Sequence, residues 1–178
     1  MEVRLIFVML SAFFLFSAYF GYLIADLFPE LAKKEIESIQ EFLKDFASNK
    51  NSPVLIFLLI LVNNSVKSFI AMLLGIFFGV IPLLFLFING IVIGILAKIV
   101  GEKIGLGVFL LLLLPHGILE IPAVILACSY GFWLGIEFLK DRKTIRGKLK
   151  YSINRFLKVV LPMLIIAAFV ETALIILT

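Results

Sequence analysis

The hydrophobic residues of this chain form long continuous runs separated by short polar stretches. A helix rises about 1.5 Å per residue, so roughly 20 consecutive apolar residues cross the ~30 Å hydrocarbon layer of a membrane. The runs therefore predict an all-α fold, a polytopic bundle of about five transmembrane helices in a single membrane domain over residues 1–178. The predicted spans are residues 5–25, 54–80, 83–99, 104–138 and 156–178, with a brief charged loop at 98–103.

The fourth run is too long for one straight crossing. Pro115 and Gly117 interrupt it, and Pro122 follows soon after. Proline removes a backbone donor and clashes with the preceding helical turn, so we expect a broken or kinked helix at Pro115–Gly117. The pattern leaves open whether residues 104–138 form one kinked crossing or a re-entrant piece followed by a crossing.

A different period follows the first run. Charged residues alternate there with apolar residues that recur every three or four positions, which predicts an amphipathic helix over residues 29–50. Its apolar positions are Ile36, Ile39, Phe42, Leu43 and Phe46. Such a helix lies on the membrane surface or packs over the bundle.

The distribution of basic residues predicts the orientation in the membrane. Eight lysines and arginines lie within residues 140–158, against four within 26–53, where acids outnumber them. Short basic loops stay on the cytoplasmic side. We therefore expect a cytoplasmic basic loop at 139–155, a cytoplasmic N-terminus, and an extracytoplasmic C-terminus and 29–50 helix, in a multi-pass protein of the cell membrane.

Three amphipathic aromatic residues lie before or within the basic stretch, namely Tyr130, Trp133 and Tyr151. Tyrosine and tryptophan are enriched at membrane–water interfaces because they combine an apolar ring with a polar group. We expect these residues to be anchors at or near the cytoplasmic interface.

Composition excludes a soluble domain. Of the 178 residues, 63% are hydrophobic and 16% are charged, whereas soluble domains are roughly half apolar and a quarter charged. The net charge of +4 comes mainly from the basic stretch beside an apolar run, so no nucleic acid partner is expected.

The only cysteine, Cys128, lies within an apolar run and is interpreted as a small buried hydrophobic residue. With no catalytic triad and no phosphate-binding glycine loop, we expect no cofactor and no enzymatic activity.

A weak internal repeat connects the second and fourth runs. A shift of fifty-two residues places 55–80 over 107–132, and Asn64 then matches His116 while Ser68 matches Glu120. Interrupted helices at corresponding positions indicate a functional site in transporter-like folds. Two leucine-rich helices also align by chance, so the pattern alone does not decide between a repeat and a coincidence.

Several polar side chains fall inside the apolar runs. His116 and Glu120 are four residues apart, which places both on one face of a helix that begins at Pro115. An ionised carboxylate at this depth needs a partner, and Lys67 is the cation that the repeat offers. The predicted intramembrane polar site comprises His116, Glu120, Lys67, Asn64, Asn89 and Glu171.

This polar group has functional and structural interpretations. It could form a proton or ion relay, a substrate site, or a metal site built from His116, Glu120 and Glu171. The metal interpretation is weak, because His116 and Glu120 alone supply two ligands, and no metal is expected. The structural alternative is a polar cluster that fixes helix packing, in which Glu171, close to the C-terminus, snorkels toward water.

Glycines recur at four-residue spacing within the runs. Small residues at this spacing allow helix backbones to approach closely in a membrane. The predicted helix-packing positions are Gly75, Gly79, Gly90, Gly94, Gly131 and Gly135.

The strings Asn89-Gly90-x-x-x-Gly94 and Leu114-Pro115-His116-Gly117-x-x-Glu120-Ile121-Pro122-Ala123 occur in this order, followed by Gly131 and Gly135. Together with Asn64 and Gly75-x-x-x-Gly79-x-x-Pro82, they resemble the signature of the stage II sporulation protein M family. The resemblance covers about residues 55–138. It implies a multi-spanning membrane protein, whose namesake in spore-forming bacteria is a scaffold for two proteins that remodel peptidoglycan.

Two hypotheses follow for the function. The first is a non-enzymatic membrane scaffold or assembly component that packs through its glycines and asparagines and self-associates as a homo-oligomer. Its partners would be the lipid bilayer and membrane or extracytoplasmic proteins bound through residues 29–50. The alternative is a small transporter or channel in which His116, Glu120 and Lys67 line a polar path.

Overall fold

The computed structural model describes residues 2–30 and 52–177, without the side chains of Leu112, Pro115, His116 and Leu177. Across that part of the chain the regular elements are all helices, and five helical stretches are long and apolar enough to cross a membrane. The predicted all-α membrane bundle is confirmed. The predicted amphipathic helix at 29–50 lies almost entirely outside the described residues.

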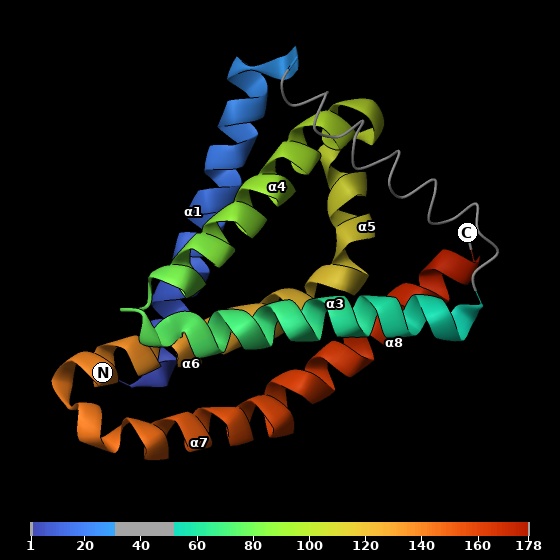
Figure 1. Ribbon diagram of the computed structural model, residues 1–178. Coiled ribbons are helices and arrows are strands. Elements are labelled where there is room, and N and C mark those ends of the chain that lie inside the picture. The colour runs from blue at the N-terminus through green and yellow to red at the C-terminus, as the bar shows by residue number, and fades with distance from the viewer. Residues whose placement is uncertain (1, 31–51, 178) are drawn as a thin grey trace.

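The helices follow the chain in the order shown in Figure 1. They are α1 (Val3–Leu27), α3 (Pro53–Leu73), α4 (Val80–Ile104), α5 (Leu106–Gly117), α6 (Glu120–Lys140), α7 (Ile145–Arg155) and α8 (Leu161–Leu177). Short turns of other helical types join them, namely η1 (Leu74–Ile76), η2 (Arg142–Thr144) and the π-helical η3 (Phe156–Val160). The start of α3 matches the sequence, because Ser52 caps the helix by accepting a hydrogen bond from the Leu55 amide at 3.3 Å.

Helix α6 is the packing centre of the bundle. In its most apolar window 56% of the residues are buried, compared with 11% to 28% in the other four candidate spans. In Figure 1, α1 and α4 lie side by side, α3 and α6 run across one end of that pair, and α8 lies beside α3. The other spans therefore turn large apolar surfaces outward, as helices surrounded by lipid do.

The third run forms a longer helix than predicted. After Gly79, whose φ of +72° suits glycine, α4 starts at Val80 and continues to Ile104. The charged loop predicted at 98–103 was wrong, because Lys98 forms an ion pair with Asp26 of α1 and another, at 3.1 Å, with Glu102 along its own helix. Ion pairs between adjacent turns stabilise a helix rather than end it.

The fourth run is divided into two helices. α5 ends at Gly117 and α6 begins at Glu120, so the break lies directly after the predicted position. Pro122 lies in the first turn of α6, where its missing N–H removes no helical hydrogen bond. The 12 residues of α5 extend about 18 Å, too short to cross a membrane, whereas α6 is long enough by itself. This geometry favours a half-length piece followed by a crossing.

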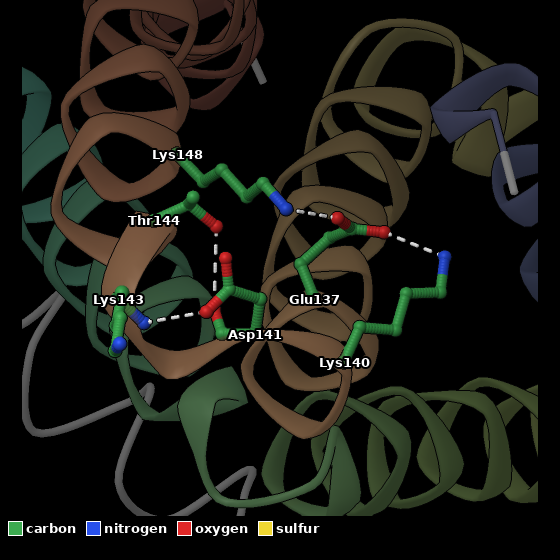
Figure 2. Close-up of polar contacts among 6 residues, drawn as sticks. All are labelled: Glu137, Lys140, Asp141, Lys143, Thr144 and Lys148. Atoms are coloured by element: carbon green, nitrogen blue, oxygen red, sulfur yellow. Dashed lines mark hydrogen bonds and ion pairs between the residues drawn. The ribbon is translucent and has the colours of Figure 1, made fainter.

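The basic stretch at 139–155 is largely helical, and its prediction as a loop was wrong. Asp141 separates α6 from η2 by accepting a hydrogen bond from the Lys143 amide at 2.9 Å, and α7 then occupies Ile145–Arg155. Figure 2 shows Glu137 of α6 held between Lys148 of α7 and Lys140, the latter at 2.8 Å. These ion pairs fasten α7 beside the end of α6, so the basic residues are displayed on a fixed helix.

Candidate intramembrane site

A cavity of about 350 Å³ lies where α1, α4, α5, α6 and α8 meet. Three polar side chains line it: Asn89 from α4, Glu120 from α6 and Glu171 from α8. The rest of the wall is apolar, as at Phe14 of α1 and Leu113 of α5. Three of the predicted polar residues therefore share one cavity, although they come from three different helices.

Glu120 is the first residue of α6, and it follows the break at once. The N-terminal end of a helix carries partial positive charge from unpaired amide groups, which favours an acid in the first turn. One of its carboxylate oxygens, Oε2, is completely shielded from solvent. The break therefore places a carboxylate at the cavity instead of in the middle of a continuous helix.

Asn89 lines the cavity from an uninterrupted helix. Its Nδ2 donates a 2.6 Å hydrogen bond to the carbonyl oxygen of Phe85, one turn earlier in α4. This bond fixes the direction of the side chain and satisfies one of its donors. Asn89 is thus held on a rigid wall of the cavity.

Glu171 lines the cavity from α8 and is half-buried. The helix continues beyond it to Leu177, and the next residue, Thr172, is buried and donates 2.7 Å to the carbonyl oxygen of Ala168. Glu171 therefore lies within a continuous helix, and it lines the same cavity as Glu120.

The cavity is lined by oxygen atoms from three helices, the carboxylates of Glu120 and Glu171 and the side-chain amide of Asn89. Carboxylate and amide oxygens are ligands of the type that hard cations accept.

A protein-family model matches the part of the chain that contains this cavity. The family model described as Stage II sporulation protein M matches residues 10–174, from α1 through all three polar cavity residues to the last turns of α8. The chain belongs to the stage II sporulation protein M family. Comparisons with curated proteins and with solved structures found no significant match. The family assignment and the five candidate spans make it a multi-pass membrane protein.

The sequence string that suggested the stage II sporulation protein M family has a clear structural counterpart. Pro115 and Gly117 form the last turn of α5, Glu120 opens α6, and Pro122 lies in its first turn. The string therefore encodes the helix break together with the carboxylate that the break places at the cavity.

Other predicted members of the polar site lie elsewhere or outside the described side chains. Lys67 is exposed on α3 and does not line the cavity, so the structure does not bring it to Glu120. Asn64 accepts a 3.2 Å hydrogen bond from Asn63 on the same helix. His116 belongs to α5, and its side chain is not among those described.

The internal repeat does not extend to the helix breaks. Asn64 lies within the continuous helix α3, whereas its counterpart His116 lies two residues before the break that follows α5. Side-chain amides at positions 63 and 64 bond to each other without disturbing the backbone ladder, so they do not interrupt α3. The prediction of interrupted helices at corresponding positions was wrong.

Within the described residues no three His, Cys, Asp or Glu side chains are grouped closely enough to hold a metal ion. The three-ligand interpretation would need His116, whose side chain lies outside that set. Glu120 and Glu171 provide carboxylate oxygens from two helices, which suits weakly held hard cations better than a structural zinc.

One set of predicted packing glycines joins η1 and the following turn to α6. A Cβ on Gly75 would lie 2.1 Å from the carbonyl oxygen of Gly131, and one on Gly135 would lie 2.4 Å from the amide nitrogen of Gly79. Any side chain at Gly75 or Gly135 would thus overlap backbone atoms. The four glycines allow the turn after α3 to rest directly on α6.

A second set joins α4 to α1. A Cβ on Gly90 would lie 2.6 Å from the Cβ of Ser17, and one on Gly94 would lie 1.9 Å from the carbonyl oxygen of Ala18. Gly21 of α1, which the sequence analysis missed, approaches the backbone of α4 equally closely. The four-residue spacing of Ser17 and Gly21 is the signal that could have identified it.

Proposed function

We propose that this protein is a small membrane transporter or channel that binds a monovalent inorganic cation or a proton in the cavity of Asn89, Glu120 and Glu171. One observation carries the proposal: carboxylates from two helices face one cavity of about 350 Å³ within the spanning bundle. Ionisable groups are costly in a membrane and are typical of ion pathways. The role is not enzymatic.

The break between α5 and α6 supports this proposal. Transporters commonly build cation sites from discontinuous helices, because a broken helix brings polar groups into the membrane while irregular backbone stays covered by protein. Glu120 opens α6 at such a break, and α5 contributes Leu113 to the opposite wall. A cation bound there would be coordinated by residues of separate helices, as in those transporters.

Ion flux into sealed liposomes tests the proposal. Purified protein in phosphatidylcholine vesicles should dissipate a proton, sodium or potassium gradient, recorded with an ion-sensitive dye inside. Glu120→Gln and Glu171→Gln should each lower the flux, because the amide removes the charge while preserving the shape. Glu102→Gln is the matched control, because Glu102 is exposed and pairs with Lys98 on α4, outside the cavity. Vesicles with wild-type protein that are as tight as empty vesicles to all three ions would contradict the proposal.

A membrane scaffold is the second candidate. An apolar groove of about 380 Å³ between the start of α3 and the end of α8 supports it. Phe57 and Phe169 are among its lining residues, and a partner's apolar helix would fit there. The packing glycines are occupied by contacts within the chain, so self-association would need another surface. Phe57→Cys in a Cys128→Ser background tests for a second copy at the groove, because oxidation with copper phenanthroline should join the introduced thiols of two copies. Leu15→Cys, at another exposed position, is the control and should stay monomeric.

The orientation in the membrane belongs to the same proposal. The basic helix α7 would lie on the cytoplasmic side, with the N-terminus beside it and the C-terminus across the membrane. Lys150→Cys, in a Cys128→Ser background, should react with a membrane-impermeant maleimide in inside-out membrane vesicles but not in intact cells. Reaction in intact cells would reverse the orientation.

A further inference from the structure

A second cavity, separate from the cation site, opens at the surface of the bundle. It measures about 390 Å³ and lies between the first turns of α1, the first half of α6 and the start of α8. No lining residue is shared with the cavity around Glu120. Its volume falls within the ~300–1,000 Å³ range of small-molecule sites. We call it the α1–α6–α8 groove.

The groove combines an apolar channel with one cation. Its apolar wall consists of Val3, Phe7, Pro122, Leu126 and Met163, together with the ring of Tyr130. Pro122, Leu126 and Tyr130 are spaced by four residues and form one stripe along about 12 Å of α6. Arg4, the one charged lining residue, is exposed.

A second arginine lies beside the groove, behind two tyrosine rings, and does not itself line it. Arg155 donates from Nε to the hydroxyl of Tyr151 at 3.1 Å, and its guanidinium lies 5.3 Å from the centre of the same ring. The Tyr151 ring packs edge-to-face on Tyr130, with 6.2 Å between the ring centres, and Tyr130 lines the groove. In residues 2–30 and 52–177, neither Arg4 nor Arg155 forms an ion pair with an acid.

The residues around the groove are of the types found at the boundary of a membrane. Arg4 lies in the first turn of the apolar helix α1, and Arg155 is the last residue of α7, just before the chain becomes apolar. Trp133 packs edge-to-face on Tyr151 at 6.0 Å, which completes a cluster of the aromatic types found at membrane interfaces. Charge at the ends of apolar segments, interfacial aromatic types and an apolar wall together are the pattern expected where a membrane surface meets its hydrocarbon layer.

We propose that the α1–α6–α8 groove binds one anionic phospholipid. An acyl chain lies along the stripe of α6 against Phe7 and Met163, and the guanidinium groups of Arg4 and Arg155 bind the phosphodiester. Guanidinium groups suit phosphate because their planar donors form paired hydrogen bonds to its oxygens. The tyrosine hydroxyls add neutral donors beside them. A lipid fits better than a soluble anion, because most of the wall is apolar.

Native mass spectrometry of the detergent-purified full chain tests the charge requirement. On titration with phosphatidylglycerol or phosphatidylcholine, we expect one tightly retained phosphatidylglycerol, with roughly tenfold preference over phosphatidylcholine. Arg4→Gln and Arg155→Gln should each reduce the preference, and the double variant should remove it. Arg142→Gln is the matched control, because Arg142 packs over Phe138, 4.9 Å from the ring centre, and Phe138 does not belong to the groove or to the Tyr130–Tyr151 pair beside it. Equal losses in the control would overturn the proposal in favour of diffuse attraction to a basic surface.

A second pair of variants tests the apolar requirement. Met163→Trp fills the groove and should displace the lipid, whereas Met9→Trp enlarges an exposed residue of α1 that does not line it and should not. Size-exclusion profiles and thermal unfolding of both variants establish that they are folded. Retention of phosphatidylglycerol by folded Met163→Trp would overturn the site. Full competition by glycerol phosphate, which lacks acyl chains, would assign the arginines to a soluble phosphate instead.

Discussion

The cavity that holds Glu120 has one continuous wall and one broken wall. On one side, α4 runs unbroken over 25 residues and presses glycine backbone against α1. On the other, α5 and α6 are separated by two residues, and the break places Glu120 at the cavity. Small residues allow helices to pack closely, and a helix break brings polar groups to a cavity, so the two walls contribute packing and polarity separately.

The largest effect is expected from breaking the continuous wall. Gly94→Leu would place a side chain where even a Cβ lies 1.9 Å from the carbonyl oxygen of Ala18, and backbone cannot give way as a side chain can. We expect most of the protein to lose its folded monomer peak in size-exclusion chromatography. Gly107→Leu is the control, because nothing lies within 4 Å of a Cβ there. Equal yields of both variants would refute the close-packed α1–α4 frame.

A smaller effect is expected from substitutions that compare how much each wall contributes to cation flux. Glu120→Gln at the broken wall should lower cation flux by roughly tenfold or more, whereas Asn89→Leu at the continuous wall should lower it only a few-fold, because interactions with charged groups are the stronger ones. Both proteins should stay folded. The comparison uses initial flux rates in vesicles at equal protein density. A larger loss in Asn89→Leu would move the binding role to α4.

Removal of the ion pairs at the end of α4 should destabilise only the nearby helix ends. Lys98→Gln removes contacts with Asp26 and Glu102, which join the ends of α1 and α4. We expect faster amide hydrogen exchange in the last turns of both helices and little change around Gly90. Lys103→Gln, at an exposed position of the same turn, is the control. Unchanged exchange in Lys98→Gln would mean that the glycine contacts alone hold this end.

The smallest effect distinguishes packed glycines from open ones. Gly147 lies in α7, and a Cβ added there would have nothing within 4 Å, so Gly147→Ala should raise stability by up to about 1 kcal/mol through higher helix propensity. Thermal unfolding in detergent would record the gain as a higher midpoint. A loss of stability would show that α7 contacts something outside the described residues.

Most of the fold could be predicted from the pattern of apolar runs, because membrane spans require length and hydrophobicity above all. The break after Gly117 was predictable from proline and glycine. Helix α7 was not predicted, because its many basic residues suggested a loop. Its apolar residues Ile145, Leu149 and Ile153 recur every four positions, and this period could have revealed the helix.

The sequence could predict which polar residues of the candidate site lie within the apolar runs, but not toward which side of its helix each one points. Asn89, Glu120 and Glu171 were selected because they lie inside apolar runs, and they do share a cavity. Lys67 met the same condition, yet it is exposed while its neighbour Ser68 is buried. The rotation of a helix about its axis depends on its neighbours, and a nearly uniform apolar run contains little periodicity from which to read it.

The burial of α6 has a consequence for how the chain enters the membrane during synthesis. α6 is the least hydrophobic of the five candidate spans, and it carries a carboxylate in its first turn. A segment of this kind partitions poorly into lipid when it leaves the translocon alone. Its neighbours α1, α3 and α4 are synthesised before it. A newly made α6 can therefore pack against these helices as it leaves the translocon, without first being surrounded by lipid. Because of the order of the helices along the chain, the helices that bury α6 are synthesised before α6 itself.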